Sequence, residues 1–277
     1  SALNLTDAWV TTVGSAVVVA VVDSGIRPNH PDLSAKLVPG YDFVSEMPFS
    51  NDGNGRDGNP EDPGDWVDKT GNATAIQQLV NAGTCGDFNA DPNLDRSSWH
   101  GTFIAGQVAA STDNLQGVAG INWAARILPV RVSGKCGALV SDLLDGVRWA
   151  AGLPVDGVPT NTAHPARVIN LSFGGSAACS PAYQTTIDDV TDAGALVVVA
   201  AGNAAGELTR PADCQGVMAV ASVRRDGAKA ARATRYQCNL TQQWLFHIKP
   251  RDMNGVYLVT IITVTHVIIL DLERQGF

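Results

Sequence analysis

The sequence predicts an α/β domain built on a doubly wound parallel sheet with helices on both faces. Two observations carry this prediction. Short apolar and largely β-branched runs recur along the chain, as expected of strands buried on both faces, and segments with helical periodicity separate several of them. The predicted strands are 16–22, 125–132, 166–173, 195–201 and 216–223. Strands that alternate with single helices form a parallel sheet, which we expect over residues 1–229.

Three segments are predicted to be helices. The first begins at His100 in "HGTFIAGQVAAS". In "SDLLDGVRWAAG" we expect Ser141 to be the N-cap and Gly152 to end the helix, and in "SPAYQTTIDDVTDAG" Ser180 and Gly194 have these roles. The region from Pro39 to Asp95 is rich in loops, with a short helix possible at 75–81.

Composition limits the classes of function. The 277 residues are 45% apolar, which is enough for a substantial core and argues against disorder. The formal net charge is -8, and Lys and Arg are not clustered, so we expect no nucleic-acid partner. An apolar run of 15 residues at 256–270 contains three threonines and a histidine. It is short for a membrane span, and we expect an added or aggregation-prone strand there and no membrane partner.

An acid ends the first predicted strand. Asp23 follows the apolar run 16–22. In doubly wound sheets ligands bind outside the carboxyl ends of the strands, and two further strands end in Gly174-Gly175 and Gly202-Asn203. Asp23 is therefore predicted to lie on the functional edge, although a strand-end Asp taken alone is more often a cap or turn residue.

His100 is the best candidate for a partner of Asp23. It opens a helix of small residues, "HGTFIAG", in which Gly101 and Gly106 would allow a neighbouring backbone to approach closely. An Asp that holds an imidazole in one tautomer and stabilises its protonated form supports a general base. A histidine at a helix start is, by itself, more often structural.

Four sequence blocks closely resemble, in order and spacing, those of the subtilisin-like serine endopeptidases, and within them the secreted bacterial branch with disulfides. The blocks are "AVVDSGIRPNHPDL", "HGTFIAGQVAA", "VINLSFGG" and "VVVAAGN". The resemblance implies a subtilisin-like fold and a secreted, extracellular enzyme. It implies that Asp23 orients His100, that His100 is the general base, and that the Asn203 amide donates to the oxyanion of the tetrahedral intermediate.

The resemblance also implies a site for an extended peptide. Ser172, Phe173 and Gly174 would form the edge segment that pairs with the substrate backbone. Ala200, Ala201 and Gly202 would form one wall of the pocket for the residue before the scissile bond. We therefore expect a peptide or protein substrate, and a monomer.

The family's nucleophile block, Gly-Thr-Ser-Met-Ala-x-Pro, is not found in this sequence. After Ser222 there is no serine at all. The segment 230–277 differs in character, with few glycines and the long apolar run, and a frameshift, a gene fusion or a misread sequence would each produce it. Cys238 is the only reasonable substitute, but "YQCNLT" lacks the Gly-Thr lead.

Two readings of function follow, and a third is weaker. The chain is an extracellular serine endopeptidase that is inactive as written, or a non-catalytic pseudoenzyme that binds extended peptides. A sugar- or nucleotide-binding protein finds no support, because no strand is followed by G-x-G-x-x-G.

The cysteines favour an oxidising compartment, because none of them are in C-x-x-C spacing. Cys179 and Cys214 each follow a predicted strand that ends at the same edge of the sheet, and we expect them to pair. Cys85 and Cys136 lie in loops with glycines close by and form the second predicted pair, which leaves Cys238 free.

A structural calcium ion is the one cofactor that we expect. The stretch "NDGNGRDGNPEDPGD" combines carboxylates with glycines that could fold around an ion, although it matches an EF-hand loop poorly. The resemblance adds Asp32, which matches a calcium ligand of some family members by position. The predicted ligands are Asp32, Asp52, Asp57, Asp62 and Asp65.

Overall fold

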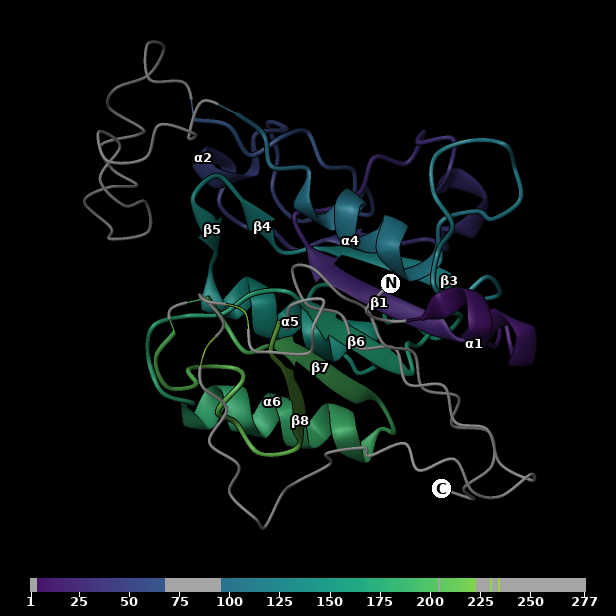
Figure 1. The fold of residues 1–277 in the computed structure, drawn as a ribbon. Helices are drawn as coiled ribbons and strands as arrows, with labels where there is room; N and C mark the ends of the chain where they lie inside the picture. Colours follow the sequence, from purple (N-terminus) through teal and green to yellow (C-terminus); the bar gives the residue numbers. More distant parts are fainter. Residues whose placement is uncertain (1–3, 68–95, 204, 223–229, 231–233, 235–277) are drawn as a thin grey trace.

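The computed structural model describes residues 4–67, 96–203, 205–222, 230 and 234 (Figure 1). The predicted helix at 75–81 and the apolar run at 256–270 lie outside these residues. Among the helices of the described ranges, none is long and apolar enough to cross a membrane.

The core of the fold is a six-stranded, fully parallel sheet in the order β2-β3-β1-β6-β7-β8. Its strands are β1 (Val18–Asp23), β2 (Tyr41–Asp42), β3 (Arg126–Arg131), β6 (Val168–Leu171), β7 (Leu196–Ala200) and β8 (Val217–Val220). The five predicted strands are all present. The strand β2 was not predicted, because two residues are too few to show a period. A separate hairpin pairs β4 (Ser133–Gly134) with β5 (Gly137–Ala138).

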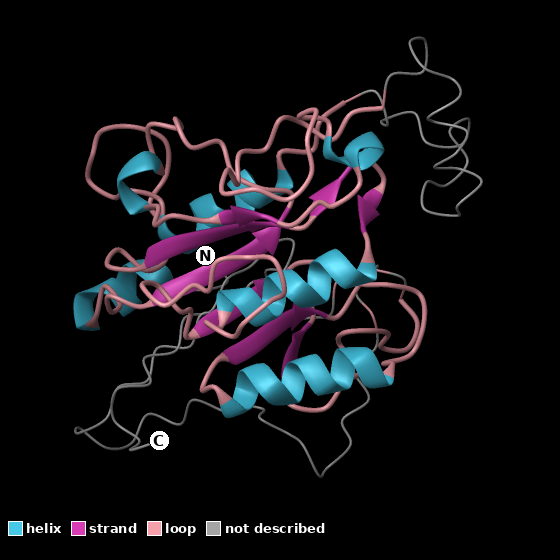
Figure 2. Ribbon diagram, turned by 180° about the vertical axis from the view of Figure 1, so that it is seen from behind, coloured by secondary structure: helices cyan, strands magenta, loops and turns pink. Residues whose placement is uncertain are grey.

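Helices cover both faces of the sheet, which confirms the doubly wound α/β fold (Figure 2). Successive side chains of a strand point to opposite faces. In β1, Ala20 and Val22 therefore join the core under α5 (Val140–Ala150) and α6 (Pro181–Asp192), whereas Val19 and Val21 join the core under α4 (His100–Ala109). The shorter helices are α1 (Leu5–Thr11), α2 (Met47–Ser50) and the 3-10 turn Ser34–Lys36.

The helix ends follow the predicted signals with one exception. Ser180 is the N-cap of α6, and Gly194 follows its last turn with a φ of 87°. The helix α5 begins earlier than predicted, with Leu139 as its N-cap, and Ser141 lies inside the first turn. The prediction missed this start because a serine in the first turn of a helix resembles an N-cap in sequence.

The direction of winding reverses at β1. The chain first adds β3 on one side of β1 and later adds β6 on the other side. A crevice forms at such a switch point, outside the carboxyl ends of the two strands that border it. Asp23 ends β1, and the segment 172–175 follows β6, so both lie at the carboxyl edge of the sheet beside this switch point.

Candidate active site

Asp23 ends β1 at the switch point of the sheet and is fully buried. Its Oδ1 accepts a hydrogen bond from the backbone N–H of Ser24 at 2.8 Å. The Nδ1 atom of His100 lies 2.7 Å from Oδ1 and 2.9 Å from Oδ2. The structure thus brings the two residues into the direct contact that the sequence predicted.

His100 is the first residue of α4 and follows Trp99, whose φ is 50°. Burial lowers the pKa of His100, but the hydrogen bond and charge of Asp23, with the charge of Asp65, outweigh it and raise the pKa above its ordinary value. The side chain is 27% exposed. With Nδ1–H donated to Asp23, the other ring nitrogen, Nε2, is left to accept a proton.

Gly101 permits the close contact between α4 and the end of β1. A Cβ at Gly101 would lie 2.2 Å from the carbonyl oxygen of Gly25 and 3.1 Å from the Cβ of Asp23, so a larger residue would push α4 away from the acid. We also expected a neighbouring backbone to lie close to Gly106. This expectation was wrong, because a Cβ at Gly106 would meet nothing within 4 Å.

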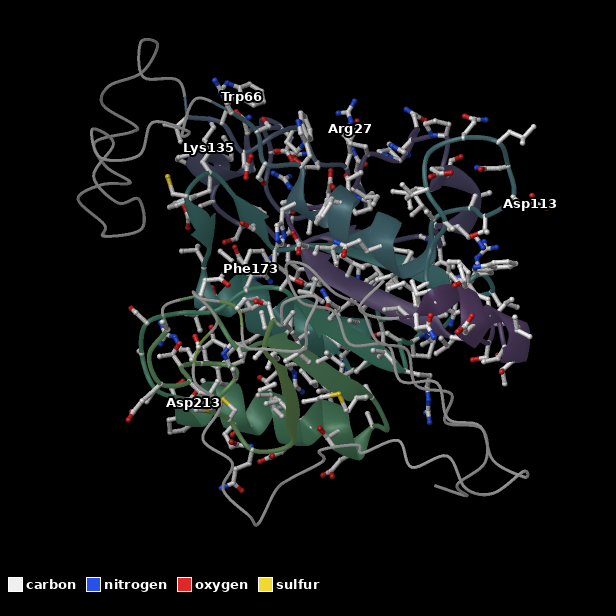
Figure 3. All side chains as sticks on the ribbon, viewed as in Figure 1. Arg27, Trp66, Asp113, Lys135, Phe173 and Asp213 are labelled. Carbon is white, nitrogen blue, oxygen red and sulfur yellow. A yellow bond between two sulfur atoms is a disulfide. The ribbon has the colours of Figure 1, made fainter. Side chains whose placement is uncertain are left out.

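The segment after β6 lies beside the imidazole. Figure 3 labels Phe173 in this segment. The centroid of its ring is 6.2 Å from that of the His100 ring. Ser172 is buried and its hydroxyl accepts a hydrogen bond from the Asn170 side chain at 3.0 Å, whereas Gly174 is exposed. A Cβ at Gly174 would meet only the carbonyl of Arg210, at 3.7 Å.

The second predicted substrate segment ends β7. Ala201 is buried and donates its N–H to the carbonyl of Val220 at 2.8 Å. Gly202 has a φ of 94°, a conformation that favours glycine, and its carbonyl accepts from the N–H of Thr234 at 3.1 Å. Asn203 follows as an exposed residue at the same carboxyl edge of the sheet.

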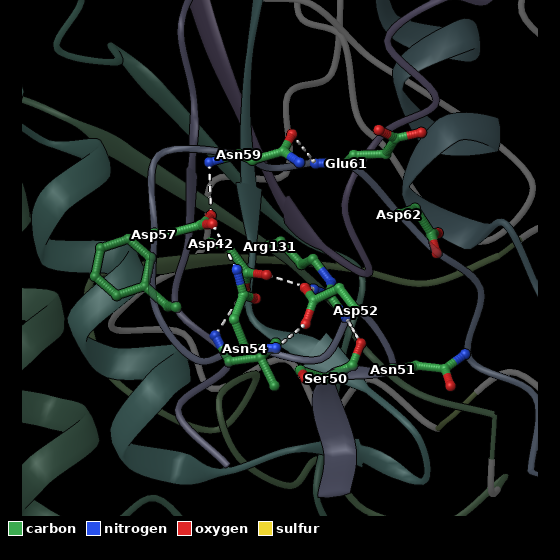
Figure 4. Close-up of polar contacts among 12 residues, drawn as sticks. Asp42, Ser50, Asn51, Asp52, Asn54, Asp57, Asn59, Glu61, Asp62 and Arg131 are labelled. Carbon is green, nitrogen blue, oxygen red and sulfur yellow. Dashed lines mark hydrogen bonds and ion pairs between the residues drawn. The ribbon is translucent and has the colours of Figure 1, made fainter. Parts of the chain in front are cut away.

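The acidic loop, residues 52–65, does not gather its carboxylates around one point (Figure 4). Asp52 pairs with Arg131. Asp57 accepts from the N–H of Asn59 at 2.7 Å and from the Asn54 side chain at 2.9 Å. Each carboxylate of this loop therefore has protein partners of its own.

The other two predicted ligands of this loop, Asp62 and Asp65, contact residues next to Asp23 and His100 in the chain. Asp62 accepts from the Ser24 hydroxyl at 2.8 Å and from the N–H of Gly64 at 2.8 Å. Asp65 accepts from the N–H and the hydroxyl of Ser98, both at 2.6 Å. Burial raises the pKa of Asp62, an effect that its hydrogen bonds offset in part.

Asp32 lies in another environment, against the segment 111–118. Its Oδ1 accepts from the Asn114 side chain at 2.7 Å, and its Oδ2 accepts from the N–H of Val118 at 2.8 Å. Within the described residues, the acids predicted as ligands form no group of three or more whose oxygens lie within 4.8 Å of one another.

A buried charge cluster was missed by the sequence analysis. Arg131, at the end of β3, is 1% exposed and binds Asp42, Asp52 and the carbonyl of Ser50. Burial raises the pKa of Asp42 to about 7, against the opposing effect of Arg131. One feature of the sequence could have indicated this cluster: Arg131 lies inside the apolar run 125–132.

The predicted pairing of Cys179 with Cys214 is confirmed, with 35 residues of sequence separation. Cys179 also donates its N–H to Asp213 at 2.8 Å, beside the same bridge. Cys136 is disulfide-bonded, and its predicted partner Cys85 lies outside the described residues, as does Cys238.

Comparison with known proteins places this architecture in a family. A model described as "Subtilase family" matches residues 14–250. The matched range extends beyond residue 229, and the domain boundary expected at that residue stays a prediction.

Two curated relatives and one solved structure are similar to the chain. It is 46% identical to an extracellular protease of Xanthomonas campestris pv. campestris, with 83% of this chain and 37% of the relative covered. It is 44% identical to an extracellular basic protease of Dichelobacter nodosus, with 78% and 34% covered. A solved structure of a protease from Pseudoalteromonas arctica is 47% identical, with a TM-score of 0.74 over 84% of this chain and 63% of that one.

The chain thus spans about a third of the length of these curated relatives. The family model covers most of its residues, and its fold agrees with that of a protease of known structure. The chain belongs to the subtilase family.

Proposed function

We propose that this chain carries the acid–base pair and the peptide-binding edge of a secreted, monomeric serine endopeptidase that hydrolyses peptide bonds in extended protein substrates. The observation that carries the proposal is the direct contact between Asp23 and His100 at the switch point of a subtilase fold. The extracellular proteases among its relatives support secretion. Residues 1–229 would form the peptidase domain, with a tail of other origin at 230–277.

In this mechanism Nε2 of His100 takes the proton of the attacking hydroxyl and returns it to the leaving amine. Asp23 holds the ring and stabilises the imidazolium. The Asn203 amide donates to the oxyanion, a contribution of about 3–4 kcal/mol to transition-state stabilisation in such sites. The segment 172–174 adds main-chain hydrogen bonds to an extended substrate, and 200–202 line the pocket before the scissile bond.

The sequence has no family block that would supply the attacking hydroxyl, and no serine follows Ser222. The coding sequence after Lys229, read in all three frames, tests the proposal. A Gly-Thr-Ser-Met-Ala block in another frame, joined after Lys229, is expected to give a product that cleaves peptide amides and loses this activity with His100→Ala. A joined product that folds and cleaves nothing would contradict the proposed function.

A peptide-binding protein without catalysis is the second candidate, favoured by the exposed segment around Gly174 and the missing block. Gly174→Ala tests it, because the added Cβ meets nothing closer than 3.7 Å and leaves the fold intact. We expect this methyl group to weaken the binding of an extended peptide roughly tenfold in fluorescence anisotropy, as an overpacked contact would. Equal affinity of the two proteins would argue against peptide binding at this edge.

We also propose a structural calcium ion, now with Asp32 as the only one of the predicted ligands. The four predicted ligands in the acidic loop do not fit one ion, because Asp52 faces the Arg131 guanidinium and Asp62 faces a hydroxyl and an amide proton. Asp32 is the remaining predicted ligand and lies apart from this loop. Its oxygens accept from the side-chain amide of Asn114 and from the N–H of Val118, so a calcium ion at Asp32 would have to replace these donors.

A further inference from the structure

The hydroxyl of Ser24 connects three parts of the candidate site. Its oxygen accepts the N–H of Gly101 at 3.1 Å, and its proton is donated to Asp62 at 2.8 Å. The backbone N–H of the same residue donates to Asp23 at 2.8 Å. Ser24 thus touches the acid on one side and the residue after His100 on the other.

This hydroxyl supplies a cap that the N-cap residue of α4 does not provide. The N–H groups of the first turn have no partner within a helix, and Trp99, at the N-cap position, provides no side-chain hydrogen bond. Ser24 satisfies one of them, that of Gly101, from the end of β1. A hydroxyl has a single proton, so its donation to Asp62 turns the oxygen lone pairs toward Gly101.

Asp62 is itself held firmly. It is 1% exposed, and its second oxygen accepts from the N–H of Gly64. Its backbone N–H donates to the carbonyl of Ile26 at 2.8 Å, and the N–H of Ile26 donates to Pro60 at 3.0 Å. The acidic loop is thereby fastened to the chain just after β1, and the carboxylate of Asp62 has a fixed direction.

Asp65 contacts the chain just before His100. It binds the backbone and the hydroxyl of Ser98, whose Oγ accepts the N–H of His100 at 3.3 Å. Its charge also contributes to the raised pKa of His100. Asp65 thus holds Ser98, two residues before His100, and Asp62 binds Ser24, which holds Gly101 just after it.

We propose that Asp62 and Asp65 are positioning residues, which hold the Asp23–His100 pair in register through the hydroxyls of Ser24 and Ser98. This role rests on the proposed function of that pair. It gives the acidic loop a task that needs no bound ion.

Proton NMR of the intact chain in the presence of a chelator tests the proposal. The Nδ1 proton of His100, hydrogen-bonded to Asp23, is expected to give a far-downfield resonance, assigned by its loss in His100→Gln. In Asp62→Asn we expect this proton to exchange with water roughly tenfold faster, the effect of losing one ordinary hydrogen bond. Ser24→Ala should have the same effect, and the double variant no more than Ser24→Ala alone, because Asp62 acts through Ser24.

Glu61→Gln is the matched control. It removes a negative charge next to Asp62, but Glu61 contacts Arg27 and not Ser24. Asp65→Asn, at a half-buried position, keeps the test decisive if Asp62→Asn does not fold. Exchange rates in Ser24→Ala and Asp65→Asn equal to those of the wild type would overturn the proposal. A wild-type protein without the downfield resonance would instead contradict the proposed Asp23–His100 pair.

Discussion

At the scale of single residues, the site depends on polar groups that are buried but fully engaged. Asp23 is fully buried, yet a backbone N–H and the His100 ring contact its carboxylate. A buried charge without such partners would cost several kcal/mol. The carboxylate can therefore remain buried and raise the pKa of His100.

The raised pKa of His100 gives a pH-dependent contribution to stability. A histidine whose folded pKa lies above its ordinary value of 6.5 stabilises the protein fully below that pH, and this contribution is lost as the pH rises through the folded pKa. The free energy of unfolding of the wild type relative to His100→Gln should therefore fall over this window. Urea titrations at a series of pH values measure it, and a difference that does not change with pH would contradict the raised pKa.

Residue patterns identified Asp23 and His100 because each stands at a boundary that local physics defines: the end of a buried run and the start of a helix of small residues. They could not reveal Arg131 with Asp42, or Ser24 with Asp62. Arg131 and Asp42 are 89 residues apart and meet as register partners of β3 and β2, and β2 is too short to show a period. Ser24 and Asp62 are 38 residues apart, and Asp62 lies in an irregular loop.

At the scale of elements, the regular strands and helices were predictable because their periodicity and end signals agree. Ser180 and Gly194 bound α6 as expected. The start of α5 was misplaced, since a serine in the first turn resembles a cap in sequence. The loops between β1 and α4 carry no period, so their contacts could not be predicted.

The two glycines of α4 give opposite predictions. Gly101→Ala should destabilise the protein by about 1–3 kcal/mol, because its Cβ would collide with the carbonyl of Gly25. Gly106→Ala should stabilise it by about 0.5–1 kcal/mol, since the space is open and alanine is the better helix former. Chemical denaturation of both variants compares them, and equal effects would contradict the close contact at Gly101.

The disulfide between Cys179 and Cys214 fastens the segment after β6 to the segment before β8. Replacing both cysteines with alanine should lower the free energy of unfolding by about 3–4 kcal/mol, the chain-entropy value for a loop of this length. Denaturant titration of the double variant under oxidising conditions leaves the bond at Cys136 intact. A loss below about 0.5 kcal/mol would contradict this contribution, as it is the level of ordinary surface substitutions.

At the scale of the whole molecule, the calcium proposal predicts a change in thermal stability. An ion that binds only the folded chain raises the unfolding midpoint by mass action. Millimolar calcium should therefore raise the midpoint relative to chelator, and Asp32→Asn should remove this increase, whereas Asp57→Asn should leave it. An unchanged midpoint in the wild type would mean that these acids bind no ion that matters to stability.

The proposed peptide-binding edge and acid–base pair stand in a sequence that has no family nucleophile block. One measurement tests this account most directly: mass spectrometry of an extended peptide incubated with the chain and with its His100→Ala variant. The account predicts that the peptide stays intact with both proteins, because without the serine the rate falls by many orders of magnitude. Cleavage by the chain that His100→Ala abolishes would contradict it.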